Sequence, residues 1–227
     1  MKRVITTLLA ALLVLSLAAC GSRVETKKLA GTWTCTIDVT DRMNAAAEQA
    51  LGLSAADGTA QMPLQLVLTV AEDGAYTLRY DSDAVRTALD AYAAALRPTA
   101  VESVYAAAEE QGLSREEYDA AMEKAGITMD DMVAAIFAGV DEEELLSLLT
   151  GRSAALTGYC RAEGGQLYLA DTAAELAETA DCLSYTLSDG TMTWTDAQGE
   201  LSSQLTEQEQ ELLRVPLTWT KRAEESK

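Results

Sequence analysis

The sequence predicts a mainly β fold: an eight-stranded antiparallel barrel that carries a helical block between its third and fourth strands. The first strand-like run, residues 29–39, alternates apolar and polar residues, and residues 217–222 nearly repeat it at the end of the chain. Six further strand-like runs lie between them. From about residue 82 to residue 150 the apolar period changes from two to 3.6. These observations indicate one β domain whose first and last strands meet.

The N-terminal residues do not belong to this fold. Lys2 and Arg3 form a short basic region, and an apolar run of 16 residues, 4–19, follows. The run is too short for a spanning helix and is typical of a signal peptide. It ends in Leu17-Ala18-Ala19-Cys20-Gly21, which resembles the lipobox of bacterial lipoproteins.

The lipobox resemblance implies that residues 1–19 are removed as a signal peptide and that Cys20 is lipidated. Residues 20–28 then form the lipidated cysteine and a short tether, which reaches at most about 28 Å from Gly21 to Lys28. The expected location is the extracytoplasmic face of the cell membrane. An ordinary secretory signal with an incidental Cys20 is the alternative.

Net charge restricts the partners of the chain. The formal charge of −19 becomes −21 when Lys2 and Arg3 are removed. We therefore expect no binding to nucleic acid, and we expect anionic headgroups to repel most of the surface. The cations beside the anchor are Arg23, Lys27 and Lys28.

The residue types present argue against an enzyme. The chain has no histidine, which excludes Ser-His-Asp and Cys-His catalysis as well as histidine metal ligands. Three cysteines besides Cys20 remain, namely Cys35, Cys160 and Cys182, and none forms a CxxC motif. Proximity favours a Cys160–Cys182 bridge, whereas three small buried thiols are an equal alternative. We expect no catalytic residue, no metal site and no cofactor, although carboxylate pairs distant in sequence would escape this reasoning.

The first part of the barrel is expected from residue 29 to residue 81. A strand from Leu29 to Thr40 places Trp33, Cys35, Ile37 and Val39 on one face. Asp41 is the expected N-cap of a helix that ends at Leu51, before Gly52. Strands at 64–70 and 75–80 then form a hairpin around Glu72-Asp73-Gly74, where glycine supplies the positive φ.

Residues 82–150 form the helical insertion, with about five short helices. A helix stop followed by a helix start recurs three times, at Gly112, Gly126 and Gly139. The N-caps are Ser114, Thr128 and Asp141, and their capping-box partners are Glu117, Asp131 and Glu144. Thr99 with Glu102, after Pro98, indicates another start. Calcium binding by the acidic clusters is disfavoured, because none has EF-hand spacing and each lies at a helix N-terminus.

The second part of the barrel is expected from residue 151 to residue 222. Strands at 156–161 and 166–170 flank the turn 163–165, and strands at 183–187 and 192–195 flank the turn 188–190. Thr172 and Glu175 are cap partners in one or two helical turns over 172–180. A short acidic helix opens at Thr206, the last strand follows Pro216, and 223–227 is a charged tail.

The ordered strands resemble the lipocalin-like barrels of many bacterial lipoproteins. The residues that carry the resemblance are Gly31-Thr32-Trp33, Thr157-Gly158-Tyr159, Leu167-Tyr168-Leu169, Leu183–Leu187, Gly190–Trp194 and Leu217–Arg222. In that family the first-strand Trp packs across the closed end of the barrel, often beside a basic residue of the last strand. The resemblance implies this structural role for Trp33 and Arg222. The large helical insertion departs from the family pattern.

Two functions are compatible with this pattern. The first is a membrane-anchored binding module that holds an unidentified apolar small molecule inside the barrel, since the inward residues are almost wholly aliphatic and aromatic. The alternative is a structural or protein-interaction lipoprotein with a solid barrel, whose helical insertion contacts an envelope protein. The expected partners are therefore the membrane, through the N-terminal lipid, and either a hydrophobic ligand or an envelope protein.

Overall fold

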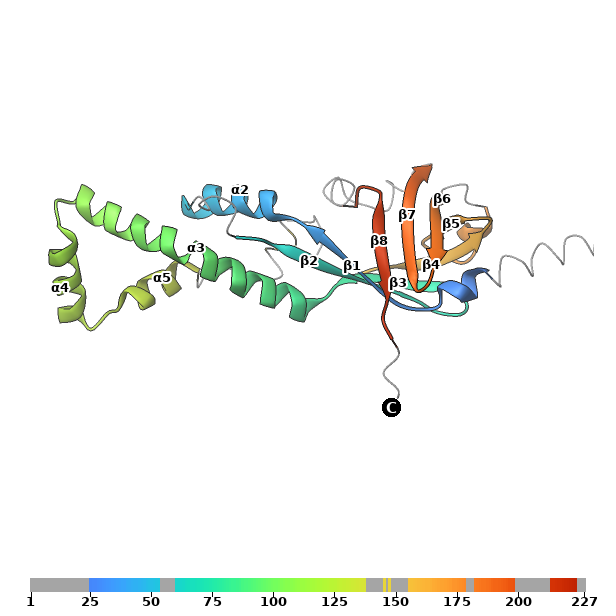
Figure 1. Cartoon of the computed structure of the whole chain (residues 1–227), viewed down its shortest axis with the longest axis horizontal. Helices are drawn as coiled ribbons and strands as arrows, with labels where there is room; N and C mark the ends of the chain where they lie inside the picture. Colours follow the sequence, from blue (N-terminus) through green and yellow to red (C-terminus); the bar gives the residue numbers. More distant parts are fainter. Residues whose placement is uncertain are drawn as a thin grey trace, which may run out of the picture. The chain divides into compact units, whose positions relative to one another are not determined.

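The computed structural model describes residues 25–53, 60–137, 145, 147, 155–178, 182–198 and 213–223, and its strands form one closed antiparallel barrel (Figure 1). The strands are β1 (Gly31–Asp38), β2 (Pro63–Val70), β3 (Ala75–Tyr80), β4 (Leu156–Glu163), β5 (Gln166–Ala170), β6 (Cys182–Ser188), β7 (Thr191–Gln198) and β8 (Leu217–Lys221). They pair in sequence order, and β1 closes on β8 with Trp33 opposite Lys221. This confirms the predicted barrel, and the pairing of β1 with β8 covers the edges that the first and last strands would otherwise present there.

The chain divides into two compact units. The barrel unit comprises Met1–Cys35, Leu66–Tyr80 and Ala154–Lys227, and the helical unit comprises Thr36–Gln65 and Asp81–Ser153. The boundary therefore passes through two strands, after Cys35 in β1 and before Leu66 in β2.

The predicted alternation of apolar and polar residues places the expected side chains inside. In β1, Trp33, Cys35 and Ile37 are buried, whereas Thr36 and Asp38 are exposed. The same alternation buries Met192, Trp194, Leu217 and Trp219 on β7 and β8. Each large side chain that is removed from water in this way contributes roughly 1.5–3 kcal/mol.

A helical turn at residues 25–29 lies against one end of the barrel. The Thr26 hydroxyl accepts a hydrogen bond from Ala162 N at 3.0 Å, and a Glu25 carboxylate oxygen accepts one from Gly164 N at 2.7 Å. The ammonium of Lys27 lies 3.5 Å from Glu72. Residues 25–28, which the sequence assigned to the tether, are therefore attached to the β2–β3 and β4–β5 ends of the barrel.

The helical unit contains α2 (Thr40–Leu51), α3 (Ser82–Glu110), α4 (Arg115–Ala125) and α5 (Met129–Phe137). Figure 1 shows α4 turning at the end of α3 and α5 running back toward α3. Leu53, Ala100 and Val133 form a small core, and Leu51, Val101, Met129 and Ile136 pack against it. Arg97 on α3 also forms an ion pair with Asp130 on α5.

The predicted helix start at Thr99 is wrong. One helix of 29 residues, α3, runs through Pro98, where the sequence predicted a new start at Thr99. Proline removes only one intrahelical hydrogen bond, and Leu96 and Ala100 on either side of it are both fully buried. Tertiary packing on both sides of the proline therefore keeps the helix continuous. The third repeat, around Gly139, lies outside the described residues.

The capping predictions have mixed outcomes. Ser114 and Glu117 form the expected capping box, and Gly126 ends α4 with a φ of 70°. Thr128 and Asp131 exchange the expected hydrogen bonds at the start of α5, as do Thr172 and Glu175 beside the 3₁₀ turn Glu175–Ala177.

The expected cap at Asp41 is wrong, because α2 begins at Thr40 and its N-cap, Val39, makes no side-chain capping bond. The hydroxyl and the N–H of Thr40 instead bond to Asp38. The acidic helix expected at Thr206 and most of the charged tail lie outside the described residues. In the described part of the chain, no helix has both the length and the apolar character needed to cross a bilayer.

Candidate functional site

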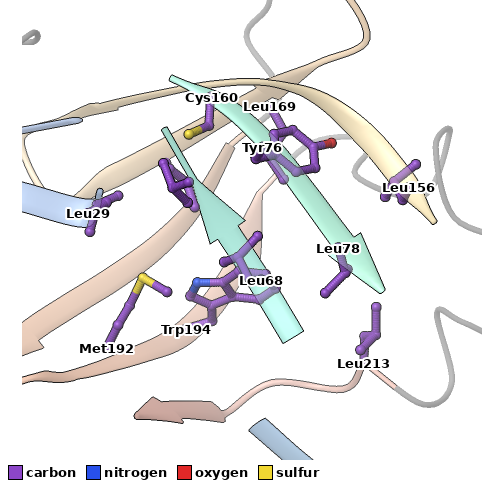
Figure 2. Close-up of a pocket in the computed structure, with 12 residues that line it drawn as sticks. Leu29, Leu68, Tyr76, Leu78, Leu156, Cys160, Leu169, Met192, Trp194 and Leu213 are labelled. Carbon is purple, nitrogen blue, oxygen red and sulfur yellow. The ribbon is translucent and has the colours of Figure 1, made fainter. Parts of the chain in front are cut away.

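The strongest candidate for a binding site is a small cavity inside the barrel. Twelve side chains line it, and almost all of them are apolar; they include Leu29, Leu68, Tyr76, Leu156, Met192 and Trp194 (Figure 2). The strand alternation points the lining residues of β2, β3, β4, β5 and β7 inward. Leu29 comes from the helical turn at residues 25–29, and Leu213 comes from the segment before β8.

The volume of this cavity is about 30 Å³. A buried water needs roughly 10–15 Å³ of such space, whereas pockets for small molecules measure about 300–1,000 Å³. Among the described residues, the side chains that line this cavity therefore leave space for only a few water molecules in it.

Two buried indole groups in the barrel have no hydrogen-bond acceptor among the described residues. Trp194 is 7% exposed and Trp219 is 0% exposed, and among the described residues nothing accepts from either Nε1. Their ring centroids lie 4.8 Å apart. Figure 2 shows the Trp194 indole turned into the cavity among Leu68 and Met192. An unpaired buried N–H costs about 1–3 kcal/mol, so an acceptor inside the cavity would be stabilised there.

The cysteines do not provide a reactive group. Cys35, Cys160 and Cys182 are all free and buried, so the Cys160–Cys182 bridge that proximity favoured is not formed. Cys160 lines the cavity, and burial, with the nearby charge of Asp73, raises the pKa of its thiol to about 12. Burial also raises the pKa of Cys35. A thiol with so high a pKa holds almost no thiolate at neutral pH and is a poor nucleophile.

The contact at Trp33 differs by one residue from the expectation. The Trp33 indole donates to the carbonyl of Leu29 at 2.7 Å, and the ammonium of Lys221 lies 5.3 Å from the ring centroid. The resemblance assigned the basic neighbour to Arg222, but Lys221 stands directly opposite Trp33 in the β1–β8 register. Gly31 makes room for this lysine, because a Cβ there would lie 2.7 Å from Lys221 Cε.

The other predictions about functional residues concern lipidation, ligand binding and metal binding. The expected lipidation site, Cys20, lies outside the described residues. The sequence named no ligand-binding residue, and the cavity residues were recognised only as inward-facing core. In the described ranges, no three His, Cys, Asp or Glu side chains are grouped so that they could hold a metal ion.

No protein-family model, curated protein or solved structure matches the chain. The fold therefore defines the class by itself: a closed eight-stranded antiparallel β-barrel with a helical insertion between β3 and β4.

Proposed function

We propose that this protein is a membrane-anchored extracytoplasmic lipoprotein of the lipocalin-like type, whose filled barrel is a scaffold and whose helical unit binds a partner protein. The observation that carries the proposal is the 30 Å³ volume of the apolar cavity, which is about a tenth of the space that a small-molecule pocket needs. Because this cavity is so small, we place recognition on the outer surface.

The distribution of charge favours the helical unit as the binding surface. Its two segments contain 20 acidic and 6 basic residues, a net charge of −14 out of the −19 of the whole chain. The partner that complements this surface is a protein with a positively charged face. Complementary charge accelerates association and discriminates against acidic proteins.

Apolar anchors lie within this acidic surface. Leu113 and Ile127, which are 38% and 41% exposed, stand in the loops before α4 and α5. Helix α4 between them has no buried residue. Apolar side chains surrounded by charged ones are typical of protein interfaces, where the apolar centre supplies most of the affinity.

The proposed anchor holds the barrel close to the membrane. Because residues 25–29 are attached to the barrel, the chain between Cys20 and Glu25 extends at most about 18 Å. The lipid on Cys20 therefore keeps one end of the barrel near the headgroups.

Site-specific photo-crosslinking in the producing cells tests the proposal. Benzoylphenylalanine is placed at Leu113, at Ile127 and, as a matched control, at Leu187 of the barrel, which is 36% exposed. We expect the crosslinker at Leu113 and at Ile127 to capture the same partner protein, and we expect no adduct from Leu187. The charge reversals Glu110→Lys, Glu116→Lys and Glu123→Lys should abolish the adduct. Equal adducts at Leu187, or adducts that survive charge reversal, would contradict the proposal.

A second candidate is the binding of an apolar small molecule with one hydrogen-bond acceptor inside the barrel. The unpaired Trp194 N–H in an apolar cavity favours it, because such a ligand would satisfy the donor. Native mass spectrometry of the full chain in detergent, with added medium-chain fatty acids and fatty alcohols, tests it. A bound ligand that shifts the NMR signal of the Trp194 indole proton supports this candidate, and the absence of any retained ligand counts against it.

A further inference from the structure

An open cleft of about 410 Å³ lies on the barrel unit where β1, β2, β3 and β8 adjoin. Thr32 of β1, Thr69 of β2, Arg79 of β3, Lys221 of β8 and the following Arg222 are among its lining residues. This cleft is distinct from the apolar cavity inside the barrel and shares no lining residue with it. Its volume falls within the range of small-molecule sites.

The cleft is cationic on a strongly acidic protein. Three of its eight lining residues are Arg or Lys and none is acidic, although the chain carries a net charge of −19. Within the described ranges, no carboxylate lies within ion-pair distance of Arg79 or Lys221, whereas Lys27 and Arg161 on the same unit are paired with Glu72 and Glu163. Among the described residues, the charges of Arg79 and Lys221 are therefore not neutralised by a carboxylate.

Local contacts hold the cations in place. Lys221 lies over the Trp33 ring in the space that Gly31 leaves, and this contact does not consume its N–H donors. Arg79 donates from Nη1 to the carbonyl of Tyr80 at 3.1 Å, and Arg222 N donates to Thr32 O at 2.8 Å. The side chains of Lys221 and Arg79 and the backbone of Arg222 are thus positioned before any ligand arrives, which lowers the entropic cost of binding.

The number and type of donors select the ligand chemistry. A carboxylate carries one charge and would leave most of the positive charge of the cleft uncompensated. A phosphate group offers several acceptor oxygens, and the planar guanidinium of arginine binds two of them at once. The hydroxyls of Thr32 and Thr69 supply additional donors at the same cleft.

We infer that this cleft binds a small phosphate-bearing molecule through Arg79, Lys221 and Arg222. The phosphate has two sources with the same chemistry: a soluble phosphate ester or a phospholipid headgroup. The headgroup source rests on the proposed lipid anchor, which keeps the start of β1 near the membrane. The soluble source needs neither the anchor nor the partner protein.

The test uses the full chain in neutral detergent micelles and follows the NMR signal of the Trp33 indole N–H, which a Trp33→Phe variant assigns. One arm adds glycerol 3-phosphate, a second adds phosphatidylglycerol to the micelles, and a control arm adds sodium chloride to the same ionic strength. The variants are Arg79→Gln and Arg222→Gln. Arg214→Gln is the matched control, since it removes an exposed arginine that does not line the cleft.

We expect a saturable shift of the Trp33 signal in at least one phosphate arm and none with chloride. Each cleft variant should weaken binding about tenfold, which corresponds to the loss of one charge-assisted hydrogen bond, while Arg214→Gln leaves it unchanged. A response to glycerol 3-phosphate identifies the soluble source, and a response only to phosphatidylglycerol identifies the headgroup. Equal shifts with chloride, or equal losses in the cleft and control variants, would overturn the inference.

Discussion

The ammonium group of Lys221 lies 5.3 Å from the centroid of the Trp33 ring, across the pair of strands that closes the barrel. This contact joins the first strand to the last. The adjacent Gly31 has a φ of +126°, and a Cβ there would lie 2.7 Å from Lys221 Cε, so the end of the lysine side chain would have to move. The Gly31-Thr32-Trp33 motif therefore has a physical explanation in this chain: the glycine admits the cation that covers the tryptophan.

Substitution of Gly31 tests this explanation. Gly31→Ala should lower the free energy of unfolding by about 2–3 kcal/mol, because it adds backbone strain and displaces Lys221 from the ring. Gly164→Ala is the matched control, since Gly164 also has a positive φ, 60°, but a Cβ added there would have no neighbour within 4 Å. Gly164→Ala should lower the free energy of unfolding by about 1 kcal/mol. Urea unfolding measures both, and equal costs would show that the lysine contact contributes nothing.

Thiol labelling tests both the burial of the cysteines and the modification of Cys20. Iodoacetamide at pH 8 should not label Cys35, Cys160 or Cys182 in the folded protein, because all three are buried. In urea, protein from the producing cells should accept three labels of the four that its cysteines allow, since a thioether at Cys20 blocks the fourth. Four labels in urea would contradict lipidation, and labels without urea would contradict the burial.

The ion pair between Arg115 and Glu102 predicts a specific pH response. Arg115 donates to both carboxylate oxygens of Glu102, at 3.2 and 2.7 Å, and these bonds with the positive charge hold the Glu102 pKa below its usual 4.5. The stabilisation is present above pH 4.5 and is lost as the pH falls through the lowered pKa of the folded state. An NMR titration of the Glu102 carboxyl in Arg115→Gln should show its pKa rising toward 4.5. An unchanged pKa would exclude Arg115 as the cause.

The hydrogen bond between Tyr92 on α3 and Asn44 on α2 should contribute to the stability of the helical unit. The Tyr92 hydroxyl, on a side chain that is 2% exposed, donates to Asn44 Oδ1 at 2.7 Å. Tyr92→Phe should therefore lower the free energy of unfolding by about 1 kcal/mol. Tyr118→Phe, which removes a hydroxyl from the partly exposed α4, should leave it within experimental error in the same urea unfolding. A larger loss for Tyr118→Phe would show that the α2–α3 bond is not the relevant contact.

Local patterns were sufficient to predict the strands and most of the turns. The β3 and β5 boundaries agree with the predicted ones, and the caps at Ser114, Thr128 and Thr172 form as their spacing indicated. These features depend on residues within a few positions of each other. Their side-chain direction and backbone hydrogen bonds are therefore set locally.

The errors arise where distant residues decide the outcome. The proline at position 98 indicated a helix boundary, yet packing on both sides of it keeps α3 continuous. The basic neighbour of Trp33 was placed at Arg222, because strand register cannot be derived from one strand alone. The candidate sites also depend on distant residues. The cavity that contains the Trp194 indole and the cationic cleft are each lined by strands that are far apart in sequence.

The sequence by itself determined that eight alternating strands surround an apolar interior and that acidic helices interrupt them after the third strand. Alternation and capping are local properties, and each is visible within a window of a few residues. Only the tertiary structure decided how completely the side chains fill the barrel and which cations meet on its surface. Free volume and charge proximity depend on how residues from several strands come together, and closure of the barrel sets that arrangement.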